Sequence, residues 1–145
     1  MYISGVDWNA NTNLIISCSY DKNIYVWSYN STRDEWLPNL VIFKSKLSLL
    51  NVKWSKKGDK FIASGAGNQK IVGYYEKELN WWKGEEFKFH KSAVTSVAFD
   101  PTGLFAISGS TDLKISIHSC FVDREDYDSN NSSEVFLPVS KVSEN

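Results

Sequence analysis

The feature that most constrains this chain is an internal repeat of about 45 residues. Aromatic residues recur at Trp8, Trp54 and Phe99, which are 46 and 45 positions apart. Each is followed by a polar turn and then by a short apolar run. Short apolar runs bounded by turns are typical of strands that are buried on both faces. A repeat of this length with several short strands per unit predicts a row of similar small β-sheets.

Composition agrees with a β fold and excludes several classes of protein. Aromatic residues make up 14% of the chain, and aromatic side chains fit the pleated surface of a sheet. The net charge of −1 argues against non-specific binding of nucleic acid. There is no apolar run of about 18 residues, so no membrane contact is expected. Cys18 and Cys120 are far apart and in no metal spacing, and the sequence predicts no metal, disulfide framework or other cofactor.

The repeat predicts about eleven strands and no helix. Apolar runs at 14–16, 61–63 and 105–107 are read as the second strand of each unit, and Ile24 to Trp27 as a third strand. The fourth strands are expected at Leu40 to Phe43 and at Phe87 to Phe89. Four short strands in a period of 40–45 residues are the mark of WD40-type β-propeller blades.

The predicted fold is therefore all-β, with about three four-stranded blades of a WD40 β-propeller. Propellers usually close with 4–8 blades of about 40 residues. We therefore expect the chain to be part of a larger, seven-bladed propeller. The expected units are an N-terminally incomplete blade at 1–45, a degenerate blade at 46–90, a blade at 91–127, and a flexible linker with an edge strand at Val135 to Val139 in 128–145.

Three polar residues of the third unit, His90, Ser108 and Asp112, have the residue types of a hydrolase triad. In WD40 repeats the same types form a buried structural network, which satisfies polar groups that would otherwise be stranded in a dry interior. We interpret them as this network. No P-loop, GxSxG elbow or HExxH helix is present, so no catalytic residue is assigned and an enzyme is not expected. The first unit keeps Ser17, Asp21 and Trp27 of the network, whereas the second has Gly67 in place of the aspartate.

Two further groups of residues are candidates for surface contacts. Trp81 and Trp82 are adjacent, and neighbouring residues of a strand point to opposite faces of the sheet. One is expected between blades, and the other is either a second core contact or an anchor for a partner. A turn is flanked by four lysines, which we interpret as a solvated face, with contact to an acidic partner as the alternative: Lys53, Lys56, Lys57 and Lys60.

A set of residues in the first two units carries a more specific pattern: Tyr25 to Trp27, Trp36, Pro38, Leu40 to Ile42, Val52, Trp54, Lys60, Phe61, Tyr75, Glu76 and Glu78 to Trp82. This set resembles consecutive blades of one WD40 family, subunit 1 of the actin-related protein 2/3 complex. The resemblance implies a non-catalytic scaffold whose partners are the other subunits of that complex, with actin filaments contacted indirectly. It also implies a place in the cytoplasm at the actin cytoskeleton, with the nucleus left open. The alternative is an unrelated WD40 adaptor that binds peptides or partner proteins. His118 and Ser119 depart from the resemblance, since they stand where a standard repeat has Trp-Asp.

Overall fold

The computed structural model describes residues 2–44 and 46–120 of the chain, so the linker and edge strand expected in 128–145 lie outside the described residues. Eleven strands and no helix lie in this part of the chain. The described residues therefore contain no helix that is long and apolar enough to cross a membrane. The expected all-β fold is confirmed. The strands are β1 (Ile3–Asn9), β2 (Leu14–Ser19), β3 (Ile24–Asn30), β4 (Glu35–Leu40), β5 (Leu49–Trp54), β6 (Lys60–Gly65), β7 (Gln69–Glu76), β8 (Trp81–Lys88), β9 (Val94–Phe99), β10 (Phe105–Ser110) and β11 (Ile115–Ser119).

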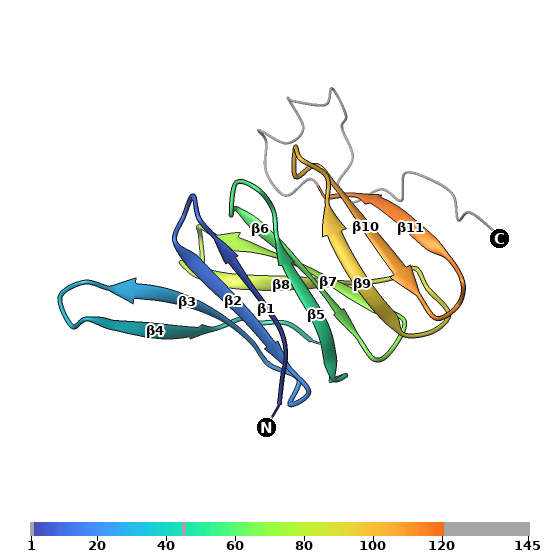
Figure 1. Cartoon of the computed structure of the whole chain (residues 1–145), viewed down its shortest axis with the longest axis horizontal. Coiled ribbons are helices and arrows are strands. Elements are labelled where there is room, and N and C mark those ends of the chain that lie inside the picture. Colours follow the sequence, from blue (N-terminus) through green and yellow to red (C-terminus); the bar gives the residue numbers. More distant parts are fainter. Residues whose placement is uncertain (1, 45, 121–145) are drawn as a thin grey trace.

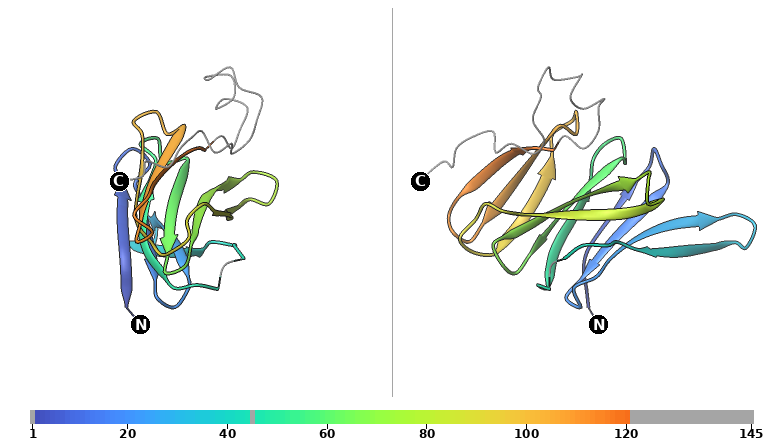
Figure 2. Two further views of the ribbon diagram at one scale, coloured as in Figure 1. Left: turned by 90° about the vertical axis from the view of Figure 1, so that its right-hand side faces the viewer. Right: turned by 180° about the vertical axis from the view of Figure 1, so that it is seen from behind.

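The strands form three antiparallel sheets that follow one another along the chain (Figure 1). The first sheet has the order β1-β2-β3-β4 and the second has the order β5-β6-β7-β8. The third has the order β11-β10-β9. Figure 2 shows from two further sides that the second sheet lies between the other two. Each sheet is a simple meander, so consecutive strands always pair.

Similar tight turns join the first and second strands of each sheet. Asn9 accepts hydrogen bonds through Oδ1 from the backbone N–H groups two and three residues further on, at 3.0 and 3.1 Å. Asp100 accepts from the N–H groups two and five residues further on, at 3.0 and 2.9 Å. The turns need a left-handed residue, which is Asn13, Gly58 or Gly103 in the three sheets. The polar residues between the apolar runs therefore set these turns.

The first interface, between the first and second sheets, is aromatic and aliphatic. Ile16 and Val26 of the first sheet are fully buried against it. The second sheet contributes Trp54, whose ring lies 5.9 Å from Phe61 and 5.3 Å from Trp82, both edge to face. Full burial of side chains of this size stabilises a fold by roughly 1.5–3 kcal/mol each. This interface is the larger of the two apolar cores in the described residues.

The second interface, between the second and third sheets, mixes apolar and polar side chains. Ile62 and Val72 of the second sheet pack against the third-sheet core. Lys60 and Lys70 are also buried there, each 1% exposed. The interpretation of Lys60 as part of a solvated face is therefore wrong. The Lys60 side chain turns inward and its Nζ donates a hydrogen bond to the carbonyl of Cys120 at 2.8 Å.

The fourth strands begin earlier than expected. They are β4 and β8, which start directly after four-residue turns, and the expected segments 40–43 and 87–89 overlap only their last residues. Each strand mixes charged with aromatic residues, so it lacks the apolar run by which the other strands are recognised. After β4 the chain crosses to the second sheet, where Ile42 donates to the carbonyl of Trp82 at 3.1 Å and accepts from the N–H of Gly84 at 2.8 Å. The segment thus pairs in parallel with the outer edge of β8.

Replacing Gly73 by alanine tests the packing of the first interface. A Cβ at Gly73 would coincide with ring atoms of Phe61, which is fully buried. We expect Gly73→Ala to destabilise the fold by about 1–3 kcal/mol, because overpacking forces the ring to move. The measurement is the urea midpoint of unfolding. Gly109→Ala is the matched control, since the nearest atom to its new Cβ would be 4.0 Å away. Equal midpoints for the two variants would contradict the packing described.

Candidate functional site

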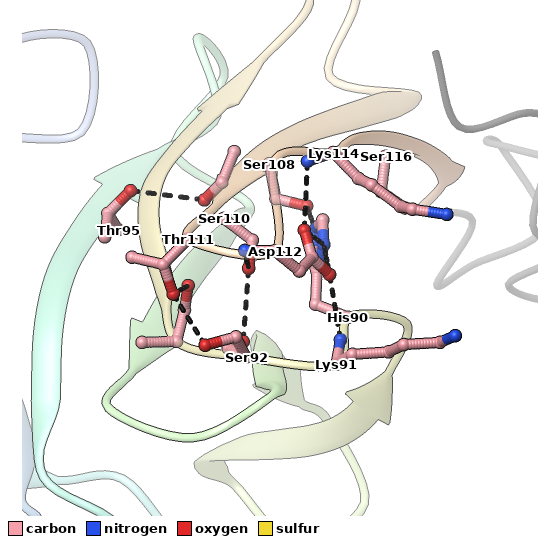
Figure 3. Close-up of polar contacts among 12 residues, drawn as sticks. His90, Lys91, Ser92, Thr95, Ser108, Ser110, Thr111, Asp112, Lys114 and Ser116 are labelled. Atoms are coloured by element: carbon pink, nitrogen blue, oxygen red, sulfur yellow. Dashed lines mark hydrogen bonds and ion pairs between the residues drawn. The ribbon is translucent and has the colours of Figure 1, made fainter. Parts of the chain in front are cut away.

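The structure brings His90, Ser108 and Asp112 together on the third sheet (Figure 3). His90 precedes β9, Ser108 lies on β10, and Asp112 lies in the β10–β11 turn. The distance from His90 Nε2 to Ser108 Oγ is 2.8 Å, and those from His90 Nδ1 to the two Asp112 oxygens are 3.1 and 3.3 Å. Ser108 is 1% exposed, so a substrate carbonyl cannot reach its hydroxyl. The geometry suits a structural network better than a nucleophile.

Asp112 fixes the position of the loop that carries His90. Its Oδ2 accepts a hydrogen bond from the backbone N–H of Lys91 at 2.8 Å, and its Oδ1 accepts from that of Lys114 at 3.0 Å. Partial burial alone would raise the pKa of Asp112, but the bonds from Lys91, His90 and Lys114 outweigh it and lower the pKa to about 2. The carboxylate is therefore charged at neutral pH and holds the turn and the loop together.

The network residues of the first sheet are brought together only in part. Trp27 Nε1 donates a hydrogen bond to Ser17 Oγ at 2.9 Å. Asp21 instead accepts from the backbone N–H of Asn23 at 3.1 Å, within the β2–β3 turn. The first sheet thus has a tryptophan–serine pair, whereas the third has a histidine–serine–aspartate cluster.

The two adjacent tryptophans of β8 have different environments. Trp82 is 8% exposed and packs against Trp54, Phe61 and Tyr75, with ring centroids 5.3, 6.2 and 5.5 Å away. Trp81 is 39% exposed, and its Nε1 donates to the carbonyl of Leu40 at 2.6 Å. Of the pair, only Trp81 presents a ring to solvent at the outer edge of the second sheet.

Two polar residues at the interface between the second and third sheets, Lys70 and His118, were not assigned to the network from the sequence. Lys70 Nζ donates a hydrogen bond to Ser108 Oγ at 2.7 Å, and burial lowers the pKa of Lys70 to about 7. His118 stacks on Phe89 with centroids 3.9 Å apart and bonds to Ser116. Burial and the nearby charges of Lys70 and His90 lower the pKa of His118 to about 3, so it is neutral. A signal for Lys70 was present, since a lysine stands where the other two units have Ile24 and Ile115.

Comparison with known proteins identifies the repeat. The family model described as "WD domain, G-beta repeat" matches residues 1–28 and 82–119. The second match contains the His90, Ser108 and Asp112 cluster. Both matched stretches of the chain are therefore WD40 repeats. No group of three or more metal-ligating side chains occurs among residues 2–44 and 46–120 of this WD40 chain.

The expected resemblance to one WD40 family is also confirmed. The chain is 40% identical over 121 residues to the Arabidopsis thaliana protein named actin-related protein 2/3 complex subunit 1A, a match that covers 83% of this chain and 32% of that protein. It is 35% identical to subunit 1A-B of Xenopus laevis, over 86% of this chain and 34% of the relative. It is 32% identical to subunit 1 of Schizosaccharomyces pombe, over 97% of this chain and 37% of that relative. The chain spans about a third of the length of these curated relatives.

The acid stability of the WD40 chain should depend on Asp112. Because its pKa is lowered in the folded state, the carboxylate adds stability above pH about 4, which is lost as the pH falls towards 2. We expect the wild-type chain to have a higher urea midpoint than Asp112→Asn at pH 7. That difference should shrink between pH 4 and pH 2. A difference that stays constant down to pH 2 would show that the charge of Asp112 contributes nothing.

Proposed function

We propose that this chain is a non-catalytic scaffold part of subunit 1 of an actin-related protein 2/3 complex. In this role it supports actin nucleation and the assembly of branched filaments through the other subunits, and it contacts actin filaments only indirectly. Its place is the cytoplasm at the actin cytoskeleton, and the nucleus is a second location to examine. The observation that carries the proposal is the 40% identity over 121 residues to a protein named as that subunit.

The chemistry of the described residues supports a scaffold. His90, Ser108 and Asp112 of the third sheet bind one another and a backbone group, and Ser108 is closed to solvent. These groups use their hydrogen-bonding capacity inside the fold, where an unpaired polar group would cost about 1–3 kcal/mol. What remains for a partner is the outer surface of the sheets.

We propose the outer-edge patch as a contact for another subunit. The patch lies where β8 meets the end of β4 and the segment after it, and it includes the exposed ring of Trp81. The bond from Trp81 Nε1 to the carbonyl of Leu40 holds the indole across the boundary between the first and second sheets. Tryptophan is enriched among residues that dominate binding energy, since it offers a large rigid apolar surface. The exposed members of the patch are Leu40, Ile42 and Trp81.

The experiment that tests the function is co-purification from the native cell. The gene product carrying this sequence is tagged, and the proteins recovered with it are identified by mass spectrometry. We expect actin-related proteins 2 and 3 together with the small subunits. Recovery of other partners without them would contradict the proposal and leave a WD40 adaptor as the better explanation.

Trp81→Ala tests the outer-edge patch in the same assay. Loss of a dominant tryptophan costs about 2 kcal/mol of binding, so we expect about thirtyfold weaker association with at least one subunit. Leu113→Ala is the control, because Leu113 is an exposed apolar residue outside the patch, in the β10–β11 turn. Unchanged recovery with Trp81→Ala would remove this residue from the contact.

A second tryptophan variant separates binding from folding. Trp82 is buried among three aromatic rings, so Trp82→Ala should lower the free energy of unfolding by about 3–5 kcal/mol. Trp81→Ala should lower the urea midpoint much less, because its ring is 39% exposed and the loss is mainly one hydrogen bond to Leu40. If Trp81→Ala also lowered the midpoint by that amount, its effect on recovery would report folding, and the contact would lose its support.

A further inference from the structure

The second sheet carries a lysine where its neighbours carry isoleucine. The first residue of the aligned third strand pairs with Cys18 in the first sheet, with Ser64 in the second and with Gly109 in the third. The residues at this position are Ile24, Lys70 and Ile115, respectively. The side chain of Lys70 enters the second interface and is 1% exposed. A buried lysine costs free energy unless it is paired and hydrogen-bonded, so its partners decide its effect.

Lys70 has two contacts at the interface, and neither is with an acid. Its Nζ donates a hydrogen bond to Ser108 Oγ on β10 at 2.7 Å, and it lies 5.1 Å from the centroid of the Phe89 ring. No ion pair is formed by Lys70 within the described part of the chain. The hydroxyl and the ring can hold the amine, but neither neutralises a charge on it.

Lys70 supplies a donor that the third sheet lacks. In the first sheet the hydroxyl of Ser17 receives its hydrogen bond from Trp27 of the same sheet, at 2.9 Å. The position of Trp27 is taken in the third sheet by His118, which bonds to Ser116. The hydroxyl of Ser108 therefore receives its donor from the second sheet. The contact between the two sheets replaces a contact that the first sheet makes internally.

The hydrogen bonds run in one direction from Lys70 to Asp112. With Lys70 donating to its oxygen, Ser108 can donate its own proton to His90 Nε2, and His90 Nδ1–H then faces the carboxylate of Asp112. The chain of bonds crosses from the second sheet to the third and ends on a charged group. The state of the amine is thus linked to the position of β10 and of the loop before β9.

We propose that Lys70 is a pH-sensitive joint between the second and third sheets, which hold together more firmly when its amine is neutral. The stability of the second interface then depends on pH in a way that the first interface does not share, since no equivalent lysine lies at the first interface. The joint is a property of the chain itself and does not depend on which partners it binds.

The groups around Lys70 account for the direction of the effect. Titratable groups face it from three elements: His90 before β9, His118 on β11 and Cys120 after β11. Its cross-strand neighbours in the second sheet, Ser64 and Phe87, carry no charge. Burial lowers the pKa of Lys70 from 10.5 to about 7, and the nearby Cys120 offsets this in part. The nearest carboxylate in the chain of bonds is Asp112, which lies beyond His90.

The sign of the pH dependence follows from these pKa values. Above pH about 7 the folded chain holds a neutral amine, whereas the exposed amine stays protonated up to about pH 10.5. The form in which the second and third sheets have separated and Lys70 is exposed therefore binds more protons between pH about 7 and about 10.5. The stability of the joint rises with pH in this range. Below pH about 7 the amine is charged in both forms, and the joint is at its weakest.

Hydrogen exchange of the whole 145-residue chain tests the joint. The protection factors of amides in β10 and β11 are divided by those in β2 and β3, with intrinsic exchange rates removed. We expect this ratio to rise about twentyfold between pH 6.5 and pH 8.5. A ratio that stays constant would overturn the proposal without any variant having to fold.

Two variants assign the pH dependence to this residue. Lys70→Met keeps the length of the side chain and removes the charge, so the ratio should become independent of pH and exceed the wild-type ratio at pH 6.5. Ser108→Ala removes the acceptor of the amine, so the ratio should fall severalfold while still rising with pH. A slope that persists in Lys70→Met would overturn the assignment.

A control lysine lies at the first interface. Lys53 on β5 forms an ion pair with Asp7 at 3.5 Å, and its side chain is 43% exposed. Lys53→Met removes a lysine that bridges two sheets at the surface, so the ratio should rise with pH as it does in the wild-type chain. Loss of the slope in Lys53→Met would show that surface charge, and not Lys70, sets the pH dependence.

Discussion

Each sheet of this protein depends on its neighbour, because both faces of a blade-like sheet are apolar. Trp8 and Trp54 hold the same position in the repeat, at the end of the first strand. Trp54 is 7% exposed because the first sheet covers it, whereas Trp8 is 62% exposed. The same residue type in the same register is a core residue or a surface residue according to what packs on it. Burial here is a property of pairs of sheets.

The two interfaces meet this requirement with different chemistry. The first uses aliphatic side chains against a cluster of tryptophan and phenylalanine rings. The second buries Lys60, Lys70 and His118, whose polar atoms must find acceptors or donors among neighbouring groups. Directional hydrogen bonds cross both interfaces, since Asn9 Nδ2 donates to the carbonyl of Ser55 at 2.9 Å and Asp7 accepts from the N–H of Trp54 at 2.8 Å at the first. What distinguishes the second interface is that its donors are buried lysine side chains. The repeats are alike in fold and unlike in what joins them.

Much of the fold could be predicted from the sequence because it is encoded locally. The repeat, the turn residues such as Asn9 and Asp100, and the apolar runs of the second strands act within a few residues of one another. The fourth strands were placed too late because β4 and β8 mix charges with aromatic rings. The alternation along a strand predicts that Trp81 and Trp82 face opposite ways, but which one is covered depends on the adjacent sheet.

The candidate site was predictable to a similar extent. His90, Ser108 and Asp112 follow from the repeat pattern, and the structure brings them together. Lys70 does not follow from a local pattern, because its partner lies 38 residues away on another sheet. A lysine in a sequence ordinarily indicates solvent, and the one sign against this is that the other two units have Ile24 and Ile115 at the matching position. The contact across the interface then shows that Lys70 is buried.

The segment after β4 has a mechanical consequence. Ile42 forms two hydrogen bonds with the outer edge of β8, and the pairing is parallel. Tension along the chain between the first and second sheets would pull Ile42 along β8, in the plane of the sheet. Both bonds lie across that direction, so they would be loaded in shear and would give way together. The segment after β4 would therefore resist a pull that separates the first and second sheets, although its sequence indicates only the end of a strand.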